Sequence, residues 1–483
     1  MARRVRWILV LGILIAAGGV VAAQLFVHPI VGVADNGDFG KIMAPAGLGY
    51  ASDDPSLRYW RWLSVKFPIV TPAERFPGQY RSSETLLARA AVDLSRLLRP
   101  GKDFDIRILG LLHAILLLAF LALIAGATWK LPVGIQAGVL AAATFVYTDV
   151  GYVSLFNSLY SQTASLLFLL LTIGVAALSL RRGKLEGALL LAYFGAAVLF
   201  ACSKPQEFVH GPLLALLGLA LAGASWRGWW RQPAVWLALA LCATAVFYYA
   251  VIPRRLIREV GLYHTVFMEL LPASPDPARD LDELGLDRSL LRYSGVHAYQ
   301  PETPIASPEF HQAFFARCGY ADVLGLYFRH PARLWDRLER AGRGAFTLRP
   351  GKPGNFDRRA GFPPQTRATH FSAWTRLRSH LGGRGGIYWV GALLAASVAA
   401  AAFLVPRTPN GRRMAWCFVV FAAMAAAELF VCAFADYLGD VSRHLYAFQG
   451  LWDALLLANL TALACALLRR RSHPGFGISG GPR

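Results

Sequence analysis

Runs of apolar residues recur along the chain, separated by shorter polar segments. A helix of about 20 apolar residues is long enough to cross the hydrocarbon core of a bilayer. We place ten such spans at about residues 7–27, 108–128, 133–150, 162–180, 186–202, 209–224, 234–252, 387–406, 414–434 and 448–468. This pattern predicts an all-α polytopic membrane protein with about ten transmembrane helices.

Two long polar segments interrupt the spans and suggest a division of the chain. Residues 1–252 form a membrane module with seven spans, whose first large loop covers 28–107. Residues 253–386 form a second large loop, and 387–483 contain three spans and a short tail. No internal repeat is visible.

Each large loop contains an amphipathic helix. In the first, Ser82-Ser83-Glu84 is a capping signal. Apolar residues follow at spacings near 3.6: Leu86, Leu87, Ala90, Leu94, Leu97 and Leu98. After His330-Pro331, one face carries Leu334, Trp335, Leu338 and Ala341, and the other carries Arg333, Arg337 and Arg340. Such helices can lie along the membrane surface or pack onto the spans, and the pattern leaves both open.

Composition and charge then fix an orientation. The chain is 55% hydrophobic and 16% charged, whereas soluble proteins carry about 25% charged residues. Arginines and lysines are concentrated before the first span and in alternate short loops: Arg3, Arg4, Arg6, Lys130, Arg181, Arg182, Lys184, Arg227, Arg231, Arg407, Arg412, Arg413, Arg469, Arg470 and Arg471. The positive-inside rule predicts that both termini are cytoplasmic and that the two large loops are extracytoplasmic. The alternative is a signal peptide cleaved at Val21-Ala22-Ala23, although its apolar run is longer than usual.

The net charge of +20 does not indicate nucleic-acid binding. The basic residues are divided among many short loops, whereas a nucleic-acid site needs them on one face. The six cysteines form no CxxC pair, so the sequence predicts neither a disulfide framework nor a zinc site.

Four polar segments that are far apart in the sequence fall on the predicted outer side. They are ADNGDFG at 34–40, FNSLYSQ at 156–162, SKPQE at 203–207 and DYLGDVSRHLY at 436–446. Taken singly, each has a structural interpretation: a capped turn, an interfacial tyrosine, a snorkelling lysine and a solvated loop. Polar residues near a membrane are costly and often functional, so their occurrence together favours a binding or catalytic site.

An acidic turn facing a basic cluster suits sugar transfer from a lipid phosphate. Arginine, lysine and protonated histidine hold the phosphate and stabilise the charge that grows on it. A carboxylate acts as the base for the attacking hydroxyl, or holds a metal that activates it. The DxxD spacing of Asp35 and Asp38 can contribute to a Mg²⁺ or Mn²⁺ site, although these oxygens are a minority of such a shell.

Several segments resemble a known family in the expected order. They are DNGDF at 35–39, SSETLL at 82–87, FNSLYSQ at 156–162, SKPQ at 203–206, DLDELGLD at 280–287, RHPARLWDRL at 329–338 and SRHLY at 442–446. Together they resemble the C-type membrane glycosyltransferases, which use polyprenyl-phosphate sugars, and within them a bacterial family of glycan-biosynthesis hexose transferases. The family pattern has Glu where this chain has Gln162, which removes a charge from that segment.

The resemblance implies a C-type fold in the bacterial cytoplasmic membrane and hexose transfer to a cell-surface glycan or lipid-linked acceptor on its outer face. Asp35 would be the catalytic carboxylate, and Asp38 its partner or a metal ligand. Lys204, Arg443 and His444 would bind the donor phosphate, and the sugar would contact Asn157, Tyr160, Gln162 and Gln206. Three other hypotheses remain: a flippase for a lipid-linked sugar, a glycan polymerase or ligase, and a non-enzymatic scaffold.

Overall fold

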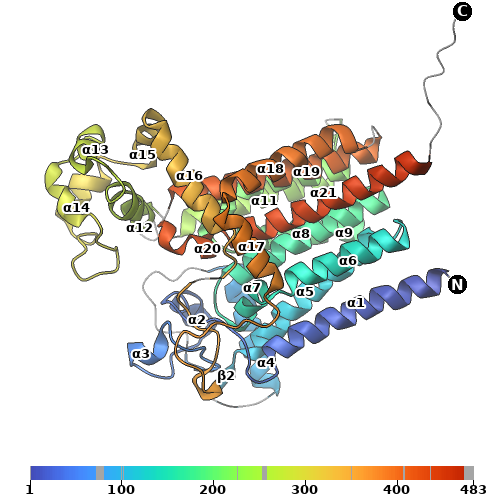
Figure 1. Ribbon diagram of the computed structural model, residues 1–483, viewed down its shortest axis with the longest axis horizontal. Helices are drawn as coiled ribbons and strands as arrows, with labels where there is room; N and C mark the ends of the chain where they lie inside the picture. The colour runs from blue at the N-terminus through green and yellow to red at the C-terminus, as the bar shows by residue number, and fades with distance from the viewer. Residues whose placement is uncertain are drawn as a thin grey trace, which may run out of the picture.

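The computed structural model is almost entirely helical (Figure 1). It describes residues 2–71, 81–98, 101, 103–225, 227–252, 258–349, 351–405, 408–435 and 437–472. The predicted tail beyond residue 472 lies outside this part, as do Arg407 and Asp436. The long helices are α1 (Ala2–Leu25), α5 (Arg107–Ala127), α6 (Val133–Tyr147), α8 (Gln162–Arg182), α9 (Gly187–Ala201), α10 (Gly211–Ala222), α11 (Pro233–Val251), α18 (Gly386–Ala399), α19 (Pro409–Phe434) and α21 (Tyr446–Ser472).

The shorter elements lie between these helices. They are α2 (Gly40–Ala46), α3 (Pro55–Arg58), α4 (Ser83–Leu98), α7 (Val150–Val153), α12 (Val260–Tyr263), α13 (Pro277–Glu283), α14 (Pro308–Phe310), α15 (Tyr320–Arg329), α16 (Pro331–Ala345), α17 (Ala373–Gly383) and α20 (Val441–His444). The two strands, β1 (Lys66–Pro68) and β2 (Asp103–Asp105), pair antiparallel and join the middle of the first large loop to its end.

Each of the ten predicted spans forms a helix, but the helices differ in length. Among the described residues, seven are long and apolar enough to cross a membrane: α1, α5, α8, α11, α18 with its π-helical extension, α19 and α21. Helix α6 reaches that length only together with the segment Val150–Asn157, to which it is bent by 47°. Helices α9 and α10, of 15 and 12 residues, are shorter than the roughly 20 residues of a full span. The fold is therefore the predicted all-α polytopic type, with seven or eight spans by length and composition.

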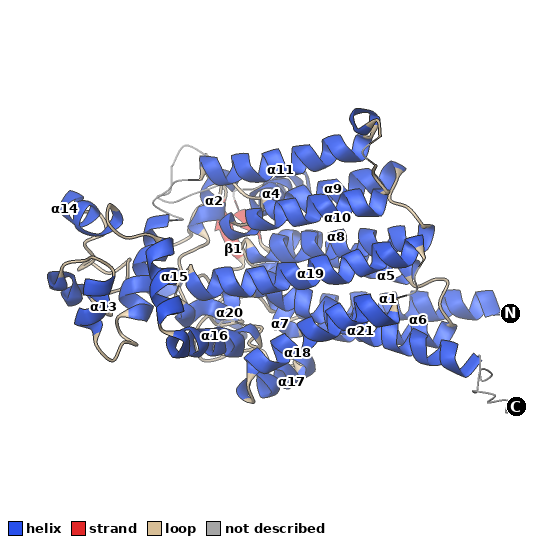
Figure 2. Ribbon diagram, turned by 90° about the horizontal axis from the view of Figure 1, so that it is seen from above, coloured by secondary structure: helices blue, strands red, loops and turns tan. Residues whose placement is uncertain are grey.

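Helix α8 lies at the centre of the bundle. In its most apolar stretch, 78% of the residues are buried inside the protein, compared with 28% in α1 and 22% in α21. Helix α8 ends at Arg181 and Arg182 because Gly183 adopts a left-handed conformation, with φ +90°, and caps the last carbonyls. The two views in Figures 1 and 2 show the start of α1 and the end of α21 at one end of the bundle and α12–α16 at the other.

The amphipathic helix of the first loop packs differently from its leucine pattern. Helix α4 buries its small residues, including Ala88, Ala91 and Ser95, whereas Leu97 and Leu98 are 81% and 65% exposed. At its start, the Ser83 amide donates to the carbonyl of Cys202, 3.1 Å away. The helix therefore packs on the bundle with its small-residue face and presents Leu86, Leu97 and Leu98 outward.

The amphipathic helix of the second loop buries part of its basic face. In α16, Arg337 is fully buried and pairs with Glu269 at 3.0 Å, and Arg333 pairs with Asp280 at 2.6 Å. Trp335 on the predicted apolar face is instead 46% exposed. Glu269 and Asp280 of the second large loop thus neutralise part of the basic face of α16.

Candidate functional site

The acidic motif 34–40 forms a tight turn held by Asp35. One carboxylate oxygen of Asp35 accepts the amides of Gly37 at 2.7 Å and Phe39 at 3.1 Å, and the other accepts the hydroxyl of Tyr50 at 2.6 Å. Gly37 has φ +103°, a conformation that glycine adopts without strain. The side chain of Asp35 is only 3% exposed, so its oxygens are committed to the turn.

Tyr160, from the second predicted segment, ties this turn to the bundle. Its hydroxyl oxygen accepts the amide of Asn36 at 3.0 Å and donates to the carbonyl of Ala34 at 2.8 Å. Its ring lies edge-on to Phe39, with centroids 4.8 Å apart. The segment preceding α8 therefore fixes the position of the acidic motif.

Asp38, on the same turn, pairs with two cations. Its carboxylate lies 2.5 Å from the ammonium of Lys41, one turn along in α2, and also accepts from the guanidinium of Arg443 in α20. The guanidinium of Arg443 lies over the ring of Tyr160, 5.3 Å from its centroid. Three of the four predicted segments thus meet at one point.

The fourth segment lies between α9 and α10. Lys204 is 5% exposed, and its ammonium lies 3.5 Å from the carbonyl oxygen of His444. The Gln206 amide donates to the same carbonyl at 2.9 Å and to the carboxylate of Glu428 at 2.5 Å. These bonds hold the lysine segment against the segment that carries Arg443.

A cavity of about 510 Å³ opens where the four segments meet. The predicted site residues that line it are Asp38, Tyr160, Gln162, Lys204, Gln206, Arg443 and His444. Sequence reasoning missed further lining residues: Lys41, Arg258, His264, Tyr299, Tyr320 and Tyr437. Lys41 and Tyr437 carried a usable signal, because Lys41 follows Asp38 by three residues and Tyr437 lies in the predicted segment 436–446. The other four belong to the second large loop, and their position depends on how that loop folds over the bundle.

Two predicted site residues, Asp35 and Asn157, do not line the cavity. The amide of the fully buried Asn157 donates to the carbonyls of Leu25 at 3.1 Å and Val31 at 2.8 Å. It therefore joins the end of α1 to the segment before α8 and does not face a sugar. Asp35 is likewise absent from the lining of the cavity in which the sequence placed a base.

The two acidic residues of the motif have opposite electrostatics. Burial raises the pKa of Asp35 to about 6, although its hydrogen bonds from Tyr50, Phe39 and Gly37 act in the other direction. Burial also acts to raise the pKa of Asp38, but the charges of Arg443 and Lys41 outweigh it and hold that pKa well below its usual range. Asp38 is therefore the permanently ionised carboxylate of the cavity.

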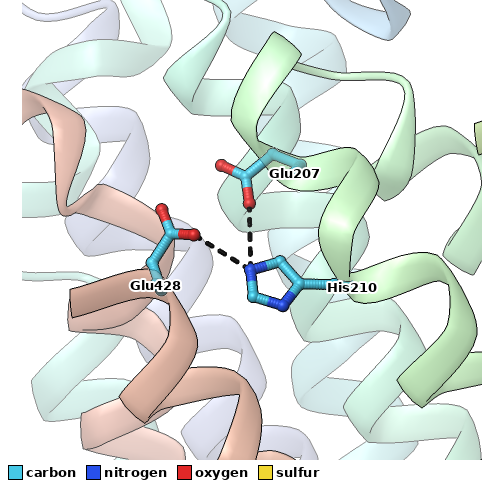
Figure 3. Close-up of side chains that lie close together, drawn as sticks. All are labelled: Glu207, His210 and Glu428. Carbon is cyan, nitrogen blue, oxygen red and sulfur yellow. Dashed lines mark hydrogen bonds and ion pairs between the residues drawn. The ribbon is translucent and has the colours of Figure 1, made fainter. Parts of the chain in front are cut away.

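The predicted pairing of Asp35 and Asp38 on Mg²⁺ or Mn²⁺ does not fit this geometry. All four carboxylate oxygens already accept from protein donors or cations. Elsewhere in the described part of the chain, ligand atoms of Glu207, His210 and Glu428 lie within 4.8 Å of one another (Figure 3). The His210 imidazole Nε2 is hydrogen-bonded to Glu428 at 2.9 Å and lies 3.8 Å from Glu207, and all three side chains are fully buried.

One family model and two solved structures match nearly the whole chain. The two solved structures resemble it with TM-scores of 0.41. One is the archaeal oligosaccharyltransferase AglB from Archaeoglobus fulgidus in complex with an inhibitory peptide and a dolichol-phosphate, and the other is an oligosaccharyltransferase from Archaeoglobus fulgidus in the apo form. They are 14% and 11% identical and cover 98% and 97% of this chain, which spans only 52% and 53% of their length. No curated protein matches in sequence. The model of the YfdI N-terminal transmembrane domain matches residues 2–475, and the chain therefore belongs to that family.

Proposed function

We propose that the protein is a membrane glycosyltransferase that moves a hexose from a polyprenyl-phosphate donor to a glycan or lipid-linked acceptor. The observation that carries this proposal is the cavity in which Arg443, Lys204 and the carboxylate of Asp38 meet. A phosphate needs cations, and a hydroxyl nucleophile needs a base. The cavity has both within one small volume.

The donor phosphate binds between Arg443 and Lys204. Arg443 is 7% exposed and Lys204 5% exposed, so a phosphate that reaches them is largely removed from water. Charge-assisted hydrogen bonds are stronger than neutral ones, and they strengthen further as the leaving phosphate gains charge. The cations therefore favour departure of the polyprenyl phosphate as well as its binding.

Asp38 is the reacting carboxylate in this proposal. When the phosphate engages Arg443, Asp38 shares that cation and its pKa rises, which makes it a better base. The acceptor hydroxyl attacks the anomeric carbon of the hexose and its proton passes to Asp38. The bond between the anomeric carbon and the phosphate oxygen breaks, and the electron pair leaves with the polyprenyl phosphate.

The remaining predicted residues take positioning and sugar-binding roles. Asp35 orients Asp38 by holding the turn, and Tyr160 fixes the turn and supports Arg443. The amide of Gln206 is engaged by Glu428 and His444, whereas that of Gln162 lines the cavity. Gln162 is therefore the amide that we assign to the sugar.

The positive-inside pattern supports an extracytoplasmic cavity. Arg181 and Arg182 end α8, whose first residue, Gln162, lines the cavity, and Lys130 lines a second cavity together with Arg181. These basic residues therefore mark the end of the bundle opposite the first cavity as the cytoplasmic one. Nucleotide sugars are absent outside the cytoplasm, so a lipid-linked donor suits this side. The bacterial cytoplasmic membrane and a cell-surface glycan acceptor belong to the same proposal.

The proposal is tested with purified protein in nanodiscs and a radiolabelled polyprenyl-phosphate hexose. A transferase releases polyprenyl phosphate in an acceptor-dependent manner. A flippase moves the intact donor across vesicle membranes without cleaving it, and a polymerase or ligase requires an oligosaccharide donor. If the protein transports the donor without cleaving it, the glycosyltransferase hypothesis is wrong and the flippase hypothesis is favoured.

A further inference from the structure

A second cavity lies at the opposite end of the bundle from the proposed active site. It has a volume of about 500 Å³ and lies among α5, α6, α8, α19 and α21. Its walls are apolar and include Phe120, Ile173, Phe418 and Leu457. This volume is within the range of roughly 300–1,000 Å³ that small-molecule sites occupy.

Three cations stand around this apolar cavity: Lys130 after α5, Arg181 in the last turn of α8 and Arg469 in α21. Lys130 and Arg469 are exposed, and Arg181 is partly buried. Among the described residues, none of the three has a carboxylate within 4.0 Å. The carboxylate of Glu186 at this end lies 3.5 Å from a different cation, Lys184.

Residues at opposite ends of α8 line the two cavities. Gln162 lines the first and Arg181 lines the second, and both belong to α8. At about 1.5 Å per residue they are about 29 Å apart along the helix axis, which is close to the thickness of a bilayer core. A lipid phosphate held at Arg181 therefore belongs to the other leaflet from one held at Arg443.

We propose that this second cavity is a binding site for an anionic phospholipid of the leaflet on the side of the termini. An acyl chain fills the apolar space, and the phosphate pairs with Lys130, Arg181 and Arg469. The occupant is a phospholipid and not the donor carrier, because the carrier phosphate must reach the opposite boundary to react. Basic pockets between transmembrane helices bind anionic headgroups in this manner.

The experiment uses the full chain in detergent and lipids that differ only in headgroup. Phosphatidylglycerol and phosphatidylcholine with the same acyl chains are titrated, and bound lipid is counted by native mass spectrometry. Each cation near an anionic headgroup contributes about 1 kcal/mol, so the triple variant Lys130→Gln/Arg181→Gln/Arg469→Gln should lose about a hundredfold in phosphatidylglycerol affinity. Wild-type protein should strongly prefer phosphatidylglycerol.

A matched control removes three charges from the same end without touching the cavity. The variant Arg182→Gln/Lys184→Gln/Arg412→Gln should keep the wild-type affinity, and Ala177→Phe, which fills the apolar space, should lose phosphatidylglycerol binding. Equal binding of the two lipids, or equal losses of phosphatidylglycerol affinity in both triple variants, would overturn the proposal. Binding of inorganic phosphate alone with the same affinity as phosphatidylglycerol would also overturn it. None of these outcomes bears on the active site at the other boundary.

Discussion

Replacing each aspartate of the acidic motif 34–40 by asparagine tests which of the two carboxylates takes part in the proposed reaction. Asp35 and Asp38 are three residues apart and equally suited to a turn by sequence. In the structure, the carboxylate of Asp35 accepts hydrogen bonds from Gly37, Phe39 and Tyr50, whereas Asp38 lines the cavity. We expect Asp38→Asn to reduce turnover by about 10²–10⁴-fold, the usual contribution of a general base. Asp35→Asn should keep activity within about tenfold.

The effect of Asp35→Asn on stability can be estimated from its titration. Its pKa rises from 3.8 to about 6 on burial, which corresponds to about 3 kcal/mol between the protonated and ionised forms. Because the folded-state pKa is raised, this stability is fully present below the unfolded pKa and is lost as the pH rises through about 6. Asparagine cannot ionise, so the variant should match or exceed wild-type stability at neutral pH.

Two assays check these expectations. Thermal unfolding of both proteins between pH 4 and pH 8 should show a fall in wild-type stability through about pH 6 that Asp35→Asn lacks. The value of kcat/KM reports ionisations of the free enzyme, and the Asp38 pKa lies well below its usual range. An acidic limb near pH 6 in the wild-type profile, with turnover lost in Asp35→Asn and kept in Asp38→Asn, would refute the assignment of Asp38 as the base.

Three further predictions follow from the same geometry. Asn157→Ala leaves two buried carbonyls without their donor, so it should lower the melting temperature by the equivalent of about 1–3 kcal/mol per group, without raising KM for the donor. His210→Ala removes a partner of Glu428, and because breaking a buried ion pair costs about 3–5 kcal/mol, the variant should unfold at a lower temperature. A melting temperature equal to wild type would show that the pair does not stabilise the protein. A single cysteine near Asn36 should react with an impermeant reagent from outside, whereas one near Gly183 should not, and the reverse result would invert the orientation.

The fold was predictable wherever one local rule decided it. Apolar length located a helix at each of the ten predicted spans, but it did not reveal that α9 and α10 stop short of a full span. Amphipathic spacing found α4 and α16. It misjudged which faces are buried, because small residues allow close packing in α4 and because Glu269 offers Arg337 a buried partner. Those outcomes depend on elements far away in the sequence.

The candidate site was predictable as a set of segments but not as a set of roles. Sorting polar segments by membrane side brought together Asp38, Tyr160, Lys204 and Arg443, which the cavity joins. The same reasoning could not distinguish Asp35 from Asp38, since only the hydrogen bonds of the folded turn separate them. The aromatic residues of the second large loop gave no signal, because their position depends on tertiary packing.

The central claim is that Arg443 and Lys204 bind the donor phosphate, and turnover of the donor by two single variants tests it most directly. Arg443→Ala and Lys204→Ala each remove a charge-assisted contact worth about 1.5–3 kcal/mol, so release of polyprenyl phosphate should fall by about ten- to a hundredfold or more. Arg412→Ala, which removes a charge at the opposite end of the bundle, should turn over like wild type. Wild-type turnover in both Arg443→Ala and Lys204→Ala would contradict the account and remove the cavity from the reaction.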